Sequence, residues 1–106
     1  MNKAVELFTA VPKLHNCAQA VADGAGNKEL AMEMAVCGGG KAPLGRCGAL
    51  HAALCLTKAE KHADLIAEFV KYAGAETCRE IKRAGTPCIE CVKIAASLVE
   101  KAKDQQ

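Results

Sequence analysis

The chain has 106 residues, a length that corresponds to a single domain. Hydrophobic residues make up 51% of it and charged residues 25%, proportions that are typical of folded proteins and exclude a wholly disordered chain. The formal net charge of +2 is too small for an electrostatic nucleic-acid binder, and no apolar run approaches the roughly 18 residues of a membrane-spanning helix. We therefore expect neither a nucleic acid nor a membrane as a partner.

Alanine dominates the composition, with 21 residues, whereas aromatic residues make up only 3%. Alanine has the highest helix propensity, and its small side chain lets helix axes approach one another closely. No segment alternates apolar and polar residues over enough positions to form a sheet. We predict an all-α fold, a single compact domain of six or seven short helices over residues 1–106.

Glycine and proline mark the expected helix boundaries. A first helix is predicted over residues 2–10, and a second from Pro12, in its first turn, to the turn at 23–27. The glycine-rich segment 38–45 cannot be helical and is predicted as a loop. Further helices are expected over 28–36, about 46–57, about 59–73, about 75–83 and 87 to about 103.

Individual residues account for several of these boundaries. Asn27 and Thr86 are predicted as N-caps, Pro87 fits the first helical position after Thr86, and Gly74 ends the helix before it. In the helix over 59–73, the spacing directs the following residues inward: His62, Ala63, Ile66, Phe69, Val70 and Ala73.

The seven cysteines are the most informative feature, and they lie at Cys17, Cys37, Cys47, Cys55, Cys78, Cys88 and Cys91. An odd number cannot all pair internally. The start of the chain is a poor signal peptide because Glu6 falls within its apolar stretch, so we expect a cytoplasmic protein. In that compartment, clustered thiols more often serve redox chemistry or metal binding than structural disulfides.

Six of these cysteines share a helix face with apolar residues: Cys17, Cys47, Cys55, Cys78, Cys88 and Cys91. Because helices pack with their apolar faces together, several sulfurs are expected to meet in or beside one core. A single cysteine is more often a small core residue, but seven in an alanine-rich chain favour chemistry over packing.

Cys88 and Cys91 form a C-x-x-C motif directly after Pro87, at the start of a predicted helix. Unpaired N–H groups and the positive end of the helix dipole stabilise a thiolate there. Two sulfurs three residues apart can form a disulfide or chelate a metal. The motif differs from a thioredoxin motif, which a βαβ pattern surrounds, and from a haem-attachment motif, because Val92 stands where histidine is required.

Cys47, His51 and Cys55 form one stripe along a predicted helix. Cys47 and His51 are four residues apart and could share an ion, so His51 is a weak candidate metal ligand. Cys55 is two turns from Cys47, about 12 Å, so a single ion cannot bind both.

Several elements of the sequence resemble the C_GCAxxG_C_C family, whose members are described as redox-active proteins. The resemblance extends over about residues 5–100 and rests on Asn16-Cys17-Ala18-Gln19-Ala20-Val21, Gly38-Gly39-Gly40, Cys47-Gly48-Ala49, Glu68-Phe69, Cys78-Arg79-Glu80-Ile81 and Cys88. It implies that the family's four shared cysteines correspond to Cys17, Cys47, Cys78 and Cys88. Ala52 stands where the family motif has glycine.

Three functions remain open at this stage. The first is a redox-active protein that uses clustered thiols for thiol–disulfide exchange with a redox partner protein, as an enzyme or as a carrier. Cys88 would attack, Cys91 or Cys78 would resolve, and Cys17 and Cys47 would form a second pair or tune the first.

The second is a zinc or iron–sulfur site that uses Cys17, Cys47, Cys78 and Cys88 as ligands. The third is a helical interaction module without a reactive site, with a homodimer as one form it could take.

Overall fold

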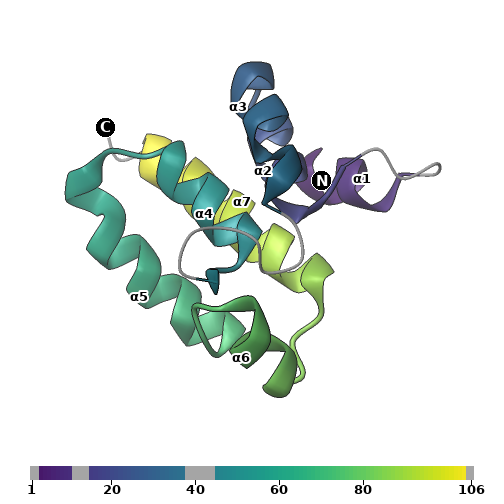
Figure 1. Cartoon of the computed structure of the whole chain (residues 1–106). Helices are drawn as coiled ribbons and strands as arrows, with labels where there is room; N and C mark the ends of the chain where they lie inside the picture. The colour runs from purple at the N-terminus through teal and green to yellow at the C-terminus, as the bar shows by residue number, and fades with distance from the viewer. Residues whose placement is uncertain (1–2, 11–14, 38–44, 105–106) are drawn as a thin grey trace.

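Helix α7 (Cys88–Asp104) runs across the whole molecule, and most of the other helices pack against it (Figure 1). The computed structural model describes residues 3–10, 15–37 and 45–104. The remaining elements, in chain order, are α1 (Lys3–Thr9), α2 (Cys17–Gly24), α3 (Lys28–Glu33), the 3-10 turn η1 (Met34–Val36), α4 (Gly48–Cys55), the 3-10 turn η3 (Ala59–Lys61), α5 (His62–Ala73) and α6 (Cys78–Arg83). Helices α1, α2, α4 and α5 all contact α7.

The all-α prediction is confirmed. The described residues form seven α-helices, and their only β-type pairing is one isolated bridge between Arg46 and Thr77. Helix α2 packs on α1, α3, α4 and α7, whereas α5 lies along the other side of α7 (Figure 1). The glycine-rich segment predicted as a loop lies, apart from Gly45, outside the described residues.

Small side chains dominate the core, as the alanine content led us to expect. Phe69, Leu50 and Val92 are fully buried. The same core contains eight alanines that are also fully buried: Ala18, Ala20, Ala22, Ala49, Ala52, Ala53, Ala73 and Ala95. Alanine at these positions allows α2, α4 and α7 to approach closely.

Several predicted helix boundaries are confirmed. The Asn27 side chain accepts a hydrogen bond from the Leu30 N–H at 3.0 Å and caps α3. Gly74 follows α5 in the left-handed conformation, with φ of 96°, which favours glycine. His62, at the start of α5, lies within hydrogen-bond distance of the Leu54 carbonyl at 2.7 Å and so ties α5 to the end of α4.

The predicted start of α2 was wrong. Its N-cap is Asn16, whose Oδ1 accepts from the Gln19 N–H at 2.7 Å while the Gln19 Oε1 accepts from the Asn16 N–H at 2.9 Å. This reciprocal capping box begins the helix at Cys17 and leaves His15 and Asn16 outside it. Pro12, the predicted first-turn residue, lies outside the described residues.

Two further predictions are corrected. The Thr86 hydroxyl does not cap α7 but donates to the Ala73 carbonyl at 2.8 Å, which joins the start of α7 to the end of α5. Ala63, expected to face inward, is exposed, and Leu65 is buried instead. The 3-10 turn η3 before His62 shifts the buried stripe of α5 relative to a helix that starts at residue 59.

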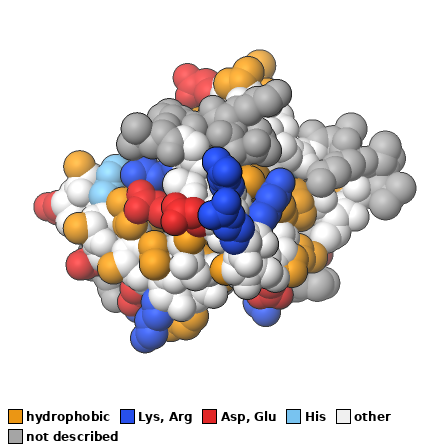
Figure 2. Space-filling view, turned by 60° about the horizontal axis from the view of Figure 1, so that its bottom comes forward, with side chains coloured by type: hydrophobic (Ala, Val, Ile, Leu, Met, Phe, Trp, Pro, Cys, Tyr) orange, Lys and Arg blue, Asp and Glu red, His pale blue; other side chains and the backbone are white. Residues whose placement is uncertain are grey.

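Charges of both signs are interspersed on the face shown in Figure 2, where basic and acidic side chains lie side by side among apolar ones. Within the described ranges, no helix is both long enough and apolar enough to cross a membrane.

Candidate functional site

Five of the seven cysteines line one small cavity. They are Cys17, Cys47, Cys78, Cys88 and Cys91, and they share the lining with Gly48, Ile81, Lys82 and Thr86. These residues belong to α2, to the start of α4, to α6 and to the start of α7. Four segments that are distant in sequence therefore bring their sulfurs together.

Each of these cysteines lies at the N-terminal end of a helix or within the first turn of that helix. Cys17 is the first residue of α2, directly after the capping box of Asn16. The Asn16 side chain also donates to the Met34 carbonyl at 3.0 Å, which fixes this end of α2 against η1. Cys47 is the N-cap residue of α4.

Backbone and ionic contacts place Cys47 beside the start of α6. The Cys47 N–H donates to the Glu76 carbonyl at 2.9 Å, and Arg46 pairs with Thr77 in the isolated β-bridge. The Arg46 guanidinium also forms an ion pair with the Glu76 carboxylate at 2.9 Å. Because Cys78 directly follows this bridge, Cys47 and Cys78 reach the same cavity.

The two cysteines of the C-x-x-C motif differ in exposure. Cys88, the first residue of α7, is exposed, whereas Cys91, one turn later, is only 2% exposed. Cys88 lines the same cavity as Cys91, but it is exposed because the first turn of α7 extends beyond the core. Cys88 lies at the rim of the cavity and Cys91 in its interior.

Three of the cavity thiols form a chain of interactions in the order Cys17, Cys47, Cys91. The thiols of Cys17 and Cys91 both lie close enough to the Cys47 thiol to shift its pKa, and all three line the cavity. At the first turn of α4, the Ala49 N–H faces the Cys17 sulfur and the Leu50 N–H faces the Cys47 sulfur. The seven cysteines are free thiols in this structure.

The three thiols differ in pKa because each is affected by its neighbours and by burial. The hydrogen bond with Cys47, followed by burial, raises the pKa of Cys17 far above its ordinary value. For Cys47, the hydrogen bond with Cys17 lowers the pKa, but the hydrogen bond with Cys91 and burial outweigh it and raise the pKa to about 11. The hydrogen bond with Cys47 lowers the pKa of Cys91 despite its burial. Cys91 therefore ionises before Cys47, and Cys17 ionises last.

Gly48 allows this close packing. A Cβ atom at Gly48 would lie 2.6 Å from the Cys37 carbonyl oxygen and 3.0 Å from the Cys17 sulfur. Both distances are shorter than van der Waals contact, so only glycine fits here. The close approach of the Cys37 carbonyl and the Cys17 sulfur thus explains the glycine of the Cys47-Gly48-Ala49 element.

The other two cysteines lie outside the cavity. Cys55, predicted to share the buried face of α4, is exposed, because it is the last residue of that helix and extends past the core. Its sulfur lies 3.8 Å from the His51 Nε2. Burial lowers the pKa of His51, and the charge of Arg46 lowers it further. Burial raises the pKa of Cys55, and the nearby Cys37 and Glu33 raise it further. Cys37 is buried in the core.

The metal alternative gains no support from this geometry. In the part of the chain that the structure describes, no group of three or more His, Cys, Asp or Glu side chains is arranged to hold a metal ion. The thiols that shift the pKa of Cys47 are Cys17 and Cys91, and Cys91 is not one of the four proposed ligands. His51, the weak candidate ligand, pairs with Cys55 and not with Cys47.

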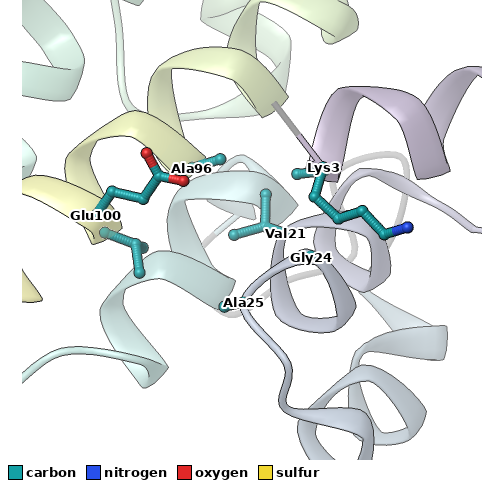
Figure 3. Close-up of a pocket in the computed structure, with 8 residues that line it drawn as sticks. Lys3, Val21, Gly24, Ala25, Ala96 and Glu100 are labelled. Carbon is teal, nitrogen blue, oxygen red and sulfur yellow. The ribbon is translucent and has the colours of Figure 1, made fainter. Parts of the chain in front are cut away.

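Another cavity, of about 130 Å³, lies between α1, α2 and α7 (Figure 3). Its lining includes Lys3 and Glu100 but no cysteine, and the amine of Lys3 points away from Glu100. The backbone of Ala4 approaches Gly24 so closely that a Cβ there would lie 2.8 Å from the Ala4 nitrogen. This cavity is a seam between closely packed helices.

Four residues that line the cysteine cavity were not predicted from the sequence as part of the site: Gly48, Ile81, Lys82 and Thr86. Ile81 and Lys82 lie three and four positions after Cys78, so helical spacing alone places them on the same face of α6. Thr86 could not be found in this way, because its position depends on its hydrogen bond to α5. Lys82 is the one charged residue among the described residues that line the cavity.

Comparison of the chain with protein-family models, with curated proteins and with solved structures finds no match.

Proposed function

We propose that this protein carries out thiol–disulfide exchange through Cys88 and Cys91. The observation that carries the proposal is the convergence of five cysteines on one cavity, with one sulfur exposed at the rim and a second buried one helical turn away. Exchange needs an accessible thiolate and a neighbouring thiol that resolves the mixed disulfide. Cys88 meets the first requirement and Cys91 the second.

The reaction has two steps. The Cys88 thiolate attacks one sulfur of a substrate disulfide, a bond forms between Cys88 and that sulfur, and the other substrate sulfur leaves as a thiolate. The Cys91 thiolate then attacks the Cys88 sulfur, and the first substrate sulfur leaves. The substrate disulfide gains two electrons and two protons, and the protein is left with a Cys88–Cys91 disulfide.

Two features of the site favour these roles. Cys88 is the first residue of α7 and is exposed, so an external disulfide can reach its sulfur. The hydrogen bond with Cys47 lowers the pKa of Cys91, which increases the fraction of Cys91 that is ionised near neutral pH. Cys78, half-buried in the same lining, is the other candidate for resolution that the sequence offers.

The substrate reacts at the rim and not inside the cavity. The cavity holds about 40 Å³, far below the roughly 300 Å³ at which ligand pockets begin. A disulfide on the surface of a peptide or a protein fits this arrangement better than an enclosed small molecule. We propose a cytoplasmic location, where a dithiol protein would reduce the Cys88–Cys91 disulfide back to two thiols. The resemblance of the sequence to the C_GCAxxG_C_C family agrees with a redox role.

A trapping experiment tests the proposal. Reduced protein is mixed with a short peptide that contains an internal disulfide, and the products are separated by intact mass after acid quenching. The variant Cys91→Ser should accumulate a covalent peptide adduct at Cys88, whereas the wild type should release reduced peptide. Cys37→Ser, which changes a buried cysteine outside the cavity, is the matched control and should behave as the wild type.

Three outcomes would contradict the proposal. The first is no adduct in Cys91→Ser while the protein remains folded, and the second is an adduct at Cys55 in place of Cys88. The third is that metal analysis finds zinc or iron in the purified protein and that activity is lost when this metal is removed.

A further inference from the structure

Two further thiols, Cys47 and Cys17, line the cavity together with Cys91. The Cys47 thiol interacts with both Cys91 and Cys17, and all three line the same cavity. Thiol–disulfide exchange requires only that a thiolate reach a disulfide sulfur, so a disulfide that involves Cys91 has a further thiol next to it. The direct exchange between Cys88 and Cys91 does not use either of these additional thiols.

We propose that the disulfide formed between Cys88 and Cys91 is passed inward to Cys17 and Cys47, so that the site holds two reducing pairs. This inference rests on the proposed function. It gives the reduced protein a capacity of four electrons, so that it reduces two substrate disulfides before it needs a reductant.

The transfer takes two balanced steps. The Cys47 thiolate attacks the Cys91 sulfur of the Cys88–Cys91 disulfide, a Cys47–Cys91 bond forms, and Cys88 leaves as a thiolate. The Cys17 thiolate then attacks the Cys47 sulfur, a Cys17–Cys47 bond forms, and Cys91 leaves. The protons of Cys47 and Cys17 end on Cys88 and Cys91, and the number of disulfides is unchanged.

The acidities of the three thiols favour this direction at equilibrium, while the raised pKa values of the attacking Cys47 and Cys17 thiols make the transfer slow. A thiol of lower pKa leaves faster, and the pKa of Cys91 is lowered whereas that of Cys47 is raised to about 11. Cys91 is therefore the better leaving group in the second step. The thiol with the most strongly raised pKa, Cys17, forms the disulfide that is least readily displaced.

The packing around Cys17 supports the last step. Cys17 and Cys47 lie at the N-terminal ends of α2 and α4, two helices that pack against each other. Gly48 leaves room for the Cys17 sulfur, because a Cβ at this position would lie only 3.0 Å from it. Once Cys17 and Cys47 are joined, Cys88 and Cys91 are again free thiols at the rim.

Counting and mapping thiols tests the relay. Reduced protein is incubated with an excess of the cyclic disulfide peptide, quenched with acid at intervals, unfolded, alkylated and analysed by peptide mass. In the wild type, a Cys88–Cys91 disulfide should appear first and a Cys17–Cys47 disulfide later, with four thiols lost at the end. Cys17→Ser and Cys17→Ala should both stop at two thiols lost, and Cys55→Ser should lose four.

The outcomes separate the relay from the proposed function. If Cys88–Cys91 forms and persists while Cys17 and Cys47 remain open to alkylation, the relay is wrong and the proposed function stands. If no disulfide forms between Cys88 and Cys91 or any other cavity pair, both are wrong. If Cys17–Cys47 forms at an unchanged rate in Cys88→Ser, the second pair is oxidised independently and the relay is wrong.

Discussion

Cys55 and Cys88 are both exposed, yet they occupy opposite kinds of helix end. Cys55 is the last residue of α4, at the negative end of the helix dipole, whereas Cys88 is the first residue of α7, at the positive end. Burial, together with Cys37 and Glu33, raises the pKa of Cys55. Cys88 lies at the rim of a cavity that contains four other thiols.

The difference shows that exposure does not by itself make a cysteine suited to redox chemistry. An accessible sulfur also needs a stabilised thiolate and a second thiol within reach. The neighbours of Cys55 are a histidine whose pKa is lowered and a buried core cysteine, whereas Cys88 has Cys91 one turn further along the same helix. The following predictions test this contrast.

The largest effect is expected from the two exposed cysteines themselves. With oxidised glutathione as substrate at pH 7.5, Cys88→Ser should lower the rate of disulfide reduction at least about a hundredfold, because Cys88 is the exposed sulfur of the described cavity lining. Cys55→Ser should change the rate by less than about twofold. Equal losses in the two variants would remove the distinction between the two helix ends.

The pH dependence of stability is expected to show the effect of the buried thiols. Folding keeps the Cys47 thiol protonated up to about pH 11, whereas the unfolded chain ionises it at its ordinary, lower pKa. Stability from this group is therefore complete below the unfolded pKa and is lost as the pH rises toward 11. In denaturant unfolding with a non-thiol reductant, the wild type should lose about 2–3 kcal/mol more than Cys47→Ala between pH 8 and pH 11. Parallel pH profiles would contradict the assigned environment.

Gly48 tests how tightly the sulfurs pack at the cavity end of α4. In an exposed helix, replacing glycine with alanine stabilises by up to about 1 kcal/mol. Here the added Cβ would meet the Cys37 carbonyl at 2.6 Å and the Cys17 sulfur at 3.0 Å. Gly48→Ala should therefore destabilise the protein by about 1–3 kcal/mol in urea unfolding. A stabilising effect would show that the cavity is looser than described.

The smallest effect is expected at the opposite end of α4. His51 lies 3.8 Å from the Cys55 sulfur, but the lowered pKa of the imidazole and the raised pKa of the thiol disfavour an ion pair between them. His51→Gln should therefore change the rate of Cys55 alkylation at pH 7.5 by less than about twofold. A loss of tenfold or more would show that the histidine activates this cysteine.

The sequence was sufficient to predict helices, most of their ends, the buried positions of Cys47 and Cys91 and the half-buried position of Cys17. Caps such as Asn27 and the stop at Gly74 depend on local backbone chemistry, which the sequence specifies directly. The exposure of Cys55 and Cys88 was not predictable from periodicity. The spacing of apolar residues shows which face of a helix packs on the core, but not which of its turns extend beyond the core. The order of contact among Cys17, Cys47 and Cys91 depends on how α2, α4 and α7 cross, which only the tertiary structure determines.

Equilibration in glutathione buffers of increasing oxidised fraction tests the central claim most directly, with disulfides mapped by peptide mass after acid quenching. We expect every disulfide within the chain to join two of the five cysteines that line the cavity, while Cys37 and Cys55 form none with them. Cavity thiols that all stay reduced in the most oxidising buffer, in a protein that is still folded, would contradict the account.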